Sequence, residues 1–257
     1  MLVLLGEIMS KKIVGAFTFN DEAHLIVMQI ETMLRVCDEV VALSDDPTHL
    51  AYDIAKSYEG LNFHLVKNDK VDRFNQRDEQ GDRNRLLLIA KALGAEIYYY
   101  TDLDEIIRME DIPAMISIMN ALPPDKKLSL RRYDLWRNAY TYRLVRDPNN
   151  SEKQGVNVPS PYTTEYACNL KFALEFDKRP IPNFHAARMP NFSVPQTTHL
   201  HERVKVIHYG YFNSALVDKK RDFYLKNSSV SNVTWGEDMR VSDTEYIKKW
   251  GAGYYKR

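Results

Sequence analysis

The sequence predicts an α/β protein built on a mostly parallel, doubly wound sheet with helices on both faces. Two observations lead to this class. Strand-like apolar runs alternate with helix-like amphipathic runs from residue 12 to residue 105, which is typical of strands joined by crossover helices. Polar clusters also follow three of the four strands predicted there, at the end where parallel sheets bind their ligands.

The first predicted unit is a strand at residues 13–18 followed by a helix. Asn20 is expected to be the helix N-cap. Asp21 and Glu22 would then lie in the first turn, where the helix dipole favours negative charge. Apolar residues recur behind them at helical spacing and would face the sheet. They are Ile26, Val27, Ile30, Met33 and Leu34.

Three more strands are predicted in the first half of the chain. They lie at residues 39–43, 63–66 and 97–100, which are rich in β-branched, aromatic and other apolar residues. A helix at about residues 48–58 and another that closes at Gly94 connect them. Because helices join the successive strands, we expect the strands to be parallel.

An acidic turn at the end of the fourth predicted strand is the main candidate site. Asp102, Asp104 and Glu105 follow the apolar run directly. In extended backbone Asp102 and Asp104 share a face, while Leu103 turns back to the protein. Two adjacent carboxylates repel each other, and a divalent cation with oxygen ligands, Mn²⁺ or Mg²⁺, balances their charge. The alternative is a strand that simply ends in an acidic turn.

Composition restricts the class of function. The chain has 257 residues with 35 Lys and Arg and 35 Asp and Glu, and this zero net charge argues against a general nucleic-acid binder. Cys37 and Cys168 are too few for a disulfide framework, which indicates a reducing, cytoplasmic location. The apolar start is interrupted by Glu7 and too short for a signal peptide or transmembrane segment. Peripheral membrane contact stays open.

Four short motifs occur in order along the first half: Phe19-Asn20-Asp21-Glu22, Ser44-Asp45-Asp46, Asp82-Arg83-Asn84-Arg85 and Thr101-Asp102-Leu103-Asp104-Glu105. Together they resemble the family 2 glycosyltransferases of GT-A fold, over roughly residues 11 to 120. The resemblance implies transfer of a sugar from a nucleoside-diphosphate sugar to a hydroxyl of a glycan or glycoconjugate. Pro47-Thr48-His49 departs from the family, which usually has a small residue, Ser and another Asp there.

Carried over by position, the resemblance implies roles for single residues. Thr18, Asn20 and Glu22 would lie near the nucleotide. Asp45 would contact the base or its ribose, and Arg83 would lie along the diphosphate. For Arg83 the alternative is a solvated helix start, although a cation near a helix N-terminus is disfavoured by the dipole and supports an anionic partner.

The same resemblance assigns the metal, Mn²⁺ or Mg²⁺, to Asp104 with Asp102 assisting, and Asp102 would also contact the donor. It implies one glycosyltransferase domain over residues 1–257. Residues 11–122 would form its nucleotide-sugar-binding half, and residues 123–257 a mixed, irregular acceptor half with C-terminal helices.

Aromatic and basic residues alternate in the second half, where strands are predicted at residues 128–136, 140–145 and within 162–176. Sugar rings stack on aromatic faces, so these residues suit an acceptor region, but a half-buried sheet has the same pattern. Both interpretations stay open. The residues are Tyr133, Trp136, Tyr140, Tyr142, Arg143, Arg146, Tyr162 and Tyr166.

A strand at residues 204–207 leads to His208, two residues before Gly210. His208-Tyr209-Gly210 resembles a late His-x-Gly motif of GT-A enzymes, which implies a metal or diphosphate ligand. The alternative is a structural histidine. His199 and His201 would share one strand face, but no motif covers them.

Three carboxylates are alternative candidates for the catalytic base that an inverting transferase needs. Asp134 and Glu165 lie in the expected interval without a motif. Glu237 lies in a Glu-Asp pair that resembles the family motif, but it follows His208, where the family normally has it before.

Two rival functions remain. A nucleotidyltransferase on a similar sheet would need a glycine-rich, basic loop after the first strand. Residues 16–20 contain no glycine and no basic residue. A sugar-binding module would keep the aromatic residues without metal chemistry.

Overall fold

A computed structural model describes most of the first half of the chain and parts of the second. The described residues are 10–60, 62–68, 78–135, 142–146, 157–159, 163–176, 187–210 and 239–240, with the backbone alone for 142–146, 157–159 and 239–240.

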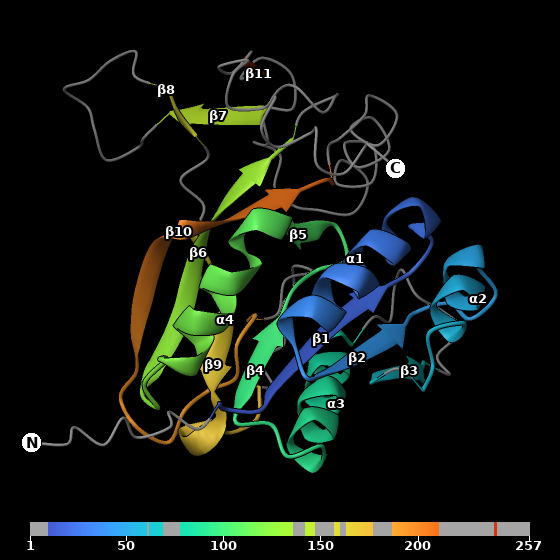
Figure 1. The fold of residues 1–257 in the computed structure, drawn as a ribbon, viewed down its shortest axis with the longest axis horizontal. Helices are drawn as coiled ribbons and strands as arrows, with labels where there is room; N and C mark the ends of the chain where they lie inside the picture. Colours follow the sequence, from blue (N-terminus) through green and yellow to red (C-terminus); the bar gives the residue numbers. More distant parts are fainter. Residues whose placement is uncertain are drawn as a thin grey trace, which may run out of the picture.

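Helices and strands alternate through the first half, as predicted (Figure 1). The helices are α1 (Ala23–Val36), α2 (Leu50–Lys56), α3 (Glu79–Ala92) and α4 (Ile112–Asn120), with short 3-10 turns η1 (Met109–Asp111) and η2 (Leu170–Phe172). The strands of the large sheet are β1 (Ile13–Phe19), β2 (Glu39–Ser44), β3 (Phe63–Lys67), β4 (Ile97–Tyr100), β5 (Glu105–Ile107), β6 (Lys126–Asp134), β9 (Thr163–Asn169) and β10 (Thr197–His208). A small sheet holds β7 (Tyr142–Arg146), β8 (Asn157–Pro159) and β11 (Met239–Arg240).

The large sheet has the strand order β3-β2-β1-β4-β9-β6-β10-β5. Strands β1 to β4 pair in parallel, and β6 pairs in parallel with β10. Only β9 and β5 run against their neighbours in this sheet. The predicted α/β class with a mostly parallel sheet is confirmed, and the arrangement is compatible with a GT-A-like nucleotide-binding fold.

Helices cover both faces of the sheet, because its strands are apolar on both sides. Along β4, Ile97 and Tyr99 belong to the core cluster with residues of α1, α2 and α4, while Tyr98 and Tyr100 belong to the cluster with residues of α3. Gly15 lets α1 approach β1 closely, since a Cβ atom there would lie 2.6 Å from the Met33 side chain. The layers place the carboxyl ends of β1, β2 and β4 at one edge.

Strands from both halves of the chain belong to this one sheet, because β6, β9 and β10 continue it beyond β4. The predicted domain of residues 1–257 extends over parts of the chain outside those described and stays a prediction. The strand predicted at residues 204–207 is the end of the longer β10, and the helix predicted at about 48–58 is the shorter α2.

The predicted N-cap of the first helix is wrong. α1 begins at Ala23 with Glu22 as its N-cap residue, and no acidic residue lies in its first turn. The backbone N–H of Asn20 instead donates to Glu22 Oε2 over 3.1 Å. This local bond keeps Asn20 and Asp21 in the loop between β1 and α1, so the helix starts later.

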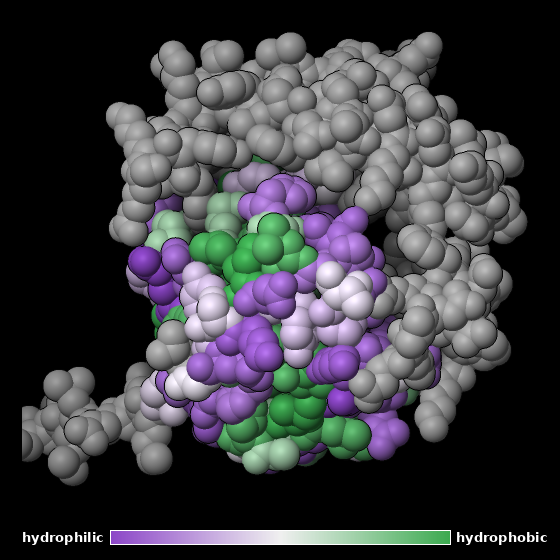
Figure 2. All heavy atoms as spheres, turned by 90° about the vertical axis from the view of Figure 1, so that its right-hand side faces the viewer, coloured by the Kyte–Doolittle hydropathy of each residue, from purple (hydrophilic) through white to green (hydrophobic). Residues whose placement is uncertain are grey.

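In the part of the chain that the structure describes, no helix is both long and apolar enough to cross a membrane. Figure 2 shows a face where hydrophobic areas are separated by hydrophilic side chains. Peripheral membrane contact and the expected cytoplasmic location stay predictions.

Candidate functional site at the carboxyl edge of the sheet

The ends of β1, β2 and β4 bring three predicted site residues to one edge. The Asp45 N–H donates to the carbonyl of Phe19 over 2.8 Å, which ties the end of β2 to that of β1. The Thr18 hydroxyl lies 3.4 Å from the Tyr100 hydroxyl, which donates to Asp102 Oδ1 over 3.4 Å. Thr18, Asp45 and Asp102 therefore belong to one edge, as the sequence predicts.

The acidic motif is a turn and not extended backbone. β4 ends at Tyr100, and the N–H of Glu105 donates to the carbonyl of Asp102 over 3.0 Å. Buried Leu103 anchors the turn, and the buried Thr101 hydroxyl donates to the Glu105 carbonyl over 2.7 Å. The turn leaves the Asp102 side chain 35% exposed and that of Asp104 18% exposed.

His208 lies between two carboxylates at the end of β10. Its register partners are Glu105 on β5 and Asp134 on β6. Its Nε2 atom lies 3.2 Å from Asp104 Oδ2, and its Nδ1 atom lies 2.8 Å from Asp134 Oδ1. Burial lowers the pKa of His208, but Asp104 and Asp134 outweigh it and raise the pKa above its ordinary value.

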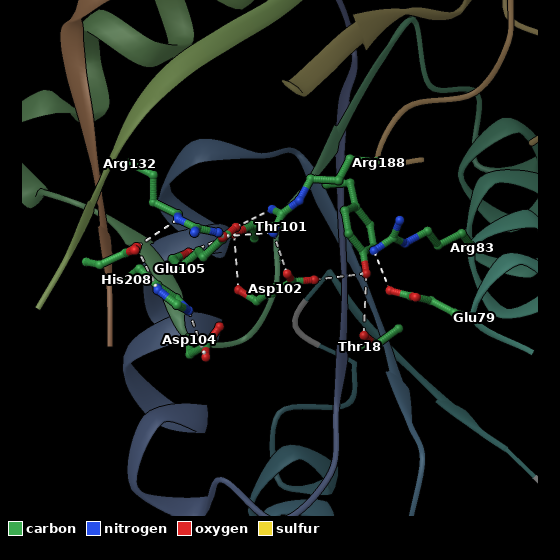
Figure 3. A network of polar contacts seen from close by, with 12 residues as sticks. Thr18, Glu79, Arg83, Thr101, Asp102, Asp104, Glu105, Arg132, Arg188 and His208 are labelled. Carbon is green, nitrogen blue, oxygen red and sulfur yellow. Dashed lines mark hydrogen bonds and ion pairs between the residues drawn. The ribbon is translucent and has the colours of Figure 1, made fainter. Parts of the chain in front are cut away.

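Two arginines that sequence reasoning missed complete the network (Figure 3). Glu105 is fully buried and is paired with both. Arg132 Nη1 donates to Glu105 Oε1 over 2.9 Å, and Arg188 donates to both Glu105 oxygens. Arg188 Nη2 also donates to Asp102 Oδ2 over 2.5 Å.

Arg188 and Arg83 keep the carboxyl group of Asp102 ionised. Burial raises the pKa of its carboxyl, but Arg188 and then Arg83 outweigh burial and hold the pKa below its ordinary value. Burial lowers the pKa of the Arg188 guanidinium. Asp102 and then Glu105 raise it by more, so the pKa lies above its ordinary value. Asp102 and Arg188 therefore form a charged pair at neutral pH.

The loop between β1 and α1 lies beside the acidic turn. Burial raises the pKa of Glu22, and the charge of Asp104 raises it further. Glu22 therefore lies within the field of Asp104, and partly exposed Asn20 precedes it in the same loop. Their predicted contact with a nucleotide stays a prediction.

Arg83 points into the protein from α3. It is 3% exposed, so the alternative of a solvated helix start is wrong. Its Nη1 donates to the carbonyl of Ala187 over 2.7 Å, and its Nη2 donates to Glu79 over 2.6 Å. The guanidinium also lies 4.9 Å from the centre of the Tyr100 ring. A contact with a diphosphate stays a prediction.

The three candidate bases lie in different surroundings. Asp134 is 1% exposed and held by His208 and Arg132, a position suited to orienting His208. Glu165 accepts hydrogen bonds from Lys127 and Thr198, which are not members of the network around Asp102. Glu237 lies outside the described residues.

The two predicted carboxylate ligands have suitable chemistry, since carboxylate oxygens bind Mn²⁺ and Mg²⁺, whereas an imidazole nitrogen is more usual with zinc, copper, iron or nickel. As arranged, however, no three His, Cys, Asp or Glu side chains among the described residues form a group able to hold a metal ion. Arg188 is paired with Asp102, and His208 with Asp104. The cation stays a prediction.

Two members of the predicted aromatic acceptor region are core residues. Tyr133 and Tyr166 are buried in the core, so neither presents a ring face on which an acceptor sugar could stack. Trp136, Tyr140 and Tyr162 lie outside the described residues, and at residues 142–146 only the backbone is described.

Fold and site together define an α/β protein with a charged cluster of carboxylates, guanidinium groups and one imidazole at the carboxyl edge of a mostly parallel sheet. No protein-family model matches the chain, and no curated protein matches its sequence.

Several solved structures resemble the fold. HddC from Yersinia pseudotuberculosis is 9% identical with a TM-score of 0.39, over 84% of this chain and 97% of that one. The 4-diphosphocytidyl-2C-methyl-D-erythritol synthase from Anaerococcus prevotii is 14% identical with a TM-score of 0.38, over 85% and 95%. A mycobacterial protein is 17% identical with a TM-score of 0.33, and the match spans 41% of its length. Likeness at this level does not assign a family or an activity to the chain.

Proposed function

We propose that the protein is a transferase that uses a nucleoside-diphosphate sugar and passes the sugar to a hydroxyl of a glycan or glycoconjugate. The observation that carries the proposal is the convergence of Thr18, Asp45 and the acidic turn at the carboxyl ends of β1, β2 and β4. Ligands of open α/β sheets bind outside these strand ends. Asp45 is then the contact to the base or ribose, remote from the reacting bond.

The charges at this edge suit a substrate whose leaving group is a diphosphate. Arg188 and Arg132 supply guanidinium groups that pair well with phosphate oxygens. Asp102 and Asp104, with His208, are the residues that would hold Mn²⁺ or Mg²⁺, and the cation would offset the negative charge of the leaving diphosphate.

Nucleotidyl transfer from a nucleoside triphosphate is the second candidate. The Anaerococcus prevotii protein that resembles the fold is a synthase of a diphosphocytidyl compound, and its name corresponds to this reaction and not to sugar transfer. In this chain, the loop after β1 carries Asn20, Asp21 and Glu22 and no basic side chain or glycine to cradle a triphosphate. That loop is the feature that favours the first candidate.

A panel of nucleotide sugars and nucleoside triphosphates, each with and without Mn²⁺, tests the proposal by thermal stabilisation. A ligand at about 100 times its Kd adds about 2.7 kcal/mol of stability. The best ligand is then incubated with candidate acceptors. Release of nucleoside diphosphate that depends on the acceptor identifies glycosyl transfer, and release of pyrophosphate that depends on the acceptor identifies nucleotidyl transfer. Binding of a nucleotide sugar that yields neither product with any acceptor would indicate a binding module and overturn the proposal.

A further inference from the structure

Arg188 joins two carboxylates that differ in their exposure to solvent. Glu105 is fully buried and accepts from both terminal nitrogens of the guanidinium. The Tyr166 ring centre lies 5.6 Å from the guanidinium carbon. Asp102 accepts one bond from Nη2, and its side chain is 35% exposed. Glu105 and Tyr166 therefore anchor Arg188, and Asp102 is the contact that a ligand from solvent can replace.

The backbone on both sides of Arg188 is fixed to the protein. The Ala187 carbonyl accepts from buried Arg83 over 2.7 Å. Asn191 exchanges backbone hydrogen bonds with residues 174–175, over 2.7 Å and 3.2 Å. Met189 is buried between these two attachments. The backbone on both sides of Arg188 thus helps to hold its guanidinium beside Asp102.

The cluster still has an excess of negative charge. Asp102, Asp104, Glu105 and Asp134 face the guanidinium groups of Arg132 and Arg188. Among the residues joined by these ion pairs, four carboxylates and two guanidinium groups leave two negative charges, or one when His208 is protonated. A divalent cation on Asp102 and Asp104 would relieve this excess, but it would lie beside the positive charge of Arg188 and repel it.

We propose that Arg188 is an internal counter-ion that couples the binding of a divalent cation to the binding of a diphosphate. Without a diphosphate, Arg188 holds Asp102 and keeps the affinity for free Mn²⁺ low. A diphosphate offers the guanidinium a new anionic partner and releases Asp102 to the cation. The coupling is reciprocal, because each ligand changes the affinity for the other by the same factor. This inference rests on the proposed function, since it requires both ligands at this edge.

The first test is a titration with Mn²⁺ alone, in which free Mn²⁺ is measured by electron paramagnetic resonance. It compares the wild-type protein, Arg188→Gln and the control Arg131→Gln. Arg131 is paired with Glu202 at the surface, so the control removes one guanidinium without touching the cluster. We expect Arg188→Gln to bind Mn²⁺ about tenfold tighter than wild type, because only molecules with a released Asp102 bind. Arg131→Gln should match the wild type.

The second test repeats the titration with UDP, GDP, ADP and CDP in turn. We expect the nucleoside diphosphate that binds best to increase the Mn²⁺ affinity of the wild type by a larger factor than that of Arg188→Gln. Circular dichroism checks that each variant is folded. If Arg188→Gln does not fold, Arg188→Lys makes the same comparison, because it keeps the charge and loses the paired donors that join Asp102 to Glu105.

The outcomes separate this inference from the proposed function. If Arg188→Gln binds Mn²⁺ no tighter than the wild type, while Asp104→Asn abolishes Mn²⁺ binding, the inference is overturned and the metal site stands. The inference is also overturned if a nucleoside diphosphate increases the Mn²⁺ affinity of the wild type and of Arg188→Gln by the same factor. If no protein binds Mn²⁺ under any condition, the inference and the metal-dependent function both fail.

Discussion

The imidazole of His208 lies 2.8 Å from the carboxylate of Asp134 through Nδ1 and 3.2 Å from that of Asp104 through Nε2. Asp134 is 1% exposed and Asp104 is 18% exposed at its side chain. His208 thus connects a buried carboxylate to one that reaches solvent. In metal sites a carboxylate commonly bonds one ring nitrogen of a histidine and fixes its orientation, as Asp134 does here for His208.

Replacement of Asp134 should change the ionisation of His208. The pKa of His208 is raised by Asp104 and Asp134 against the effect of burial, so Asp134→Asn should lower it. Histidine NMR titration in metal-free buffer measures this. Glu165→Gln is the control, because Glu165 contacts Lys127 and Thr198 instead. An unchanged His208 pKa in Asp134→Asn would show that the two side chains are not coupled.

The same pair predicts a pH dependence of stability. A histidine whose pKa is raised on folding stabilises the folded state while it is protonated. Its contribution is complete below the unfolded pKa of about 6.5 and is lost as the pH rises through the folded pKa. We therefore expect urea unfolding to show that His208→Gln costs more stability at pH 6 than at pH 9, in metal-free buffer. An equal cost at both pH values would contradict this.

Asp104→Asn should nearly abolish transfer and leave the fold intact. The residue lies on a partly exposed turn, so the core is unchanged, while loss of metal-assisted charge stabilisation removes several kcal/mol. At about 1.4 kcal/mol per tenfold, turnover should fall at least about a hundredfold. Turnover with saturating Mn²⁺ and limiting donor, beside the melting temperature, measures both effects. A folded variant that keeps most of its activity would show that Asp104 is not needed for metal-assisted transfer.

Asp45→Ala should weaken nucleotide binding and leave Mn²⁺ binding unchanged. Asp45 lies at the end of β2, next to β1, and is nearly buried. Calorimetry with the free nucleoside diphosphate measures the affinity. The matched control is Asp53→Ala, which removes an exposed carboxylate from α2. Equal nucleotide affinities in the two variants would mean that residues 44–46 only end a strand.

Both cysteines should be unreactive in the native protein. Burial raises the pKa of Cys168 to about 12 and that of Cys37 well above its ordinary value, and thiolates are the reactive form. At pH 8 a thiol reagent should modify neither residue until denaturant is added, after which both should react. Fast reaction of one thiol in the folded protein would show that its surroundings open in solution.

Much of the fold follows from local sequence patterns. The apolar run of β1, the helical spacing in α1 and the alternating faces of β4 depend on residues close in sequence, so periodicity predicts them. The turn after Tyr100 was predictable in position but not in shape. Its shape depends on Thr101 and Leu103 being buried by segments from elsewhere in the chain.

The sequence by itself determined the parallel half of the sheet and the edge at which Thr18, Asp45, Asp102 and Asp104 meet. These residues lie at or directly after the ends of parallel strands, and the carboxyl ends of parallel strands lie at the same edge of a sheet. Only the tertiary structure decided the charge balance of that edge. Glu105 is 27 residues from Arg132 and 83 from Arg188, and no motif marks either arginine. These pairs exist because strands and segments distant in sequence bury one carboxylate, and a buried charge requires partners wherever the fold can supply them.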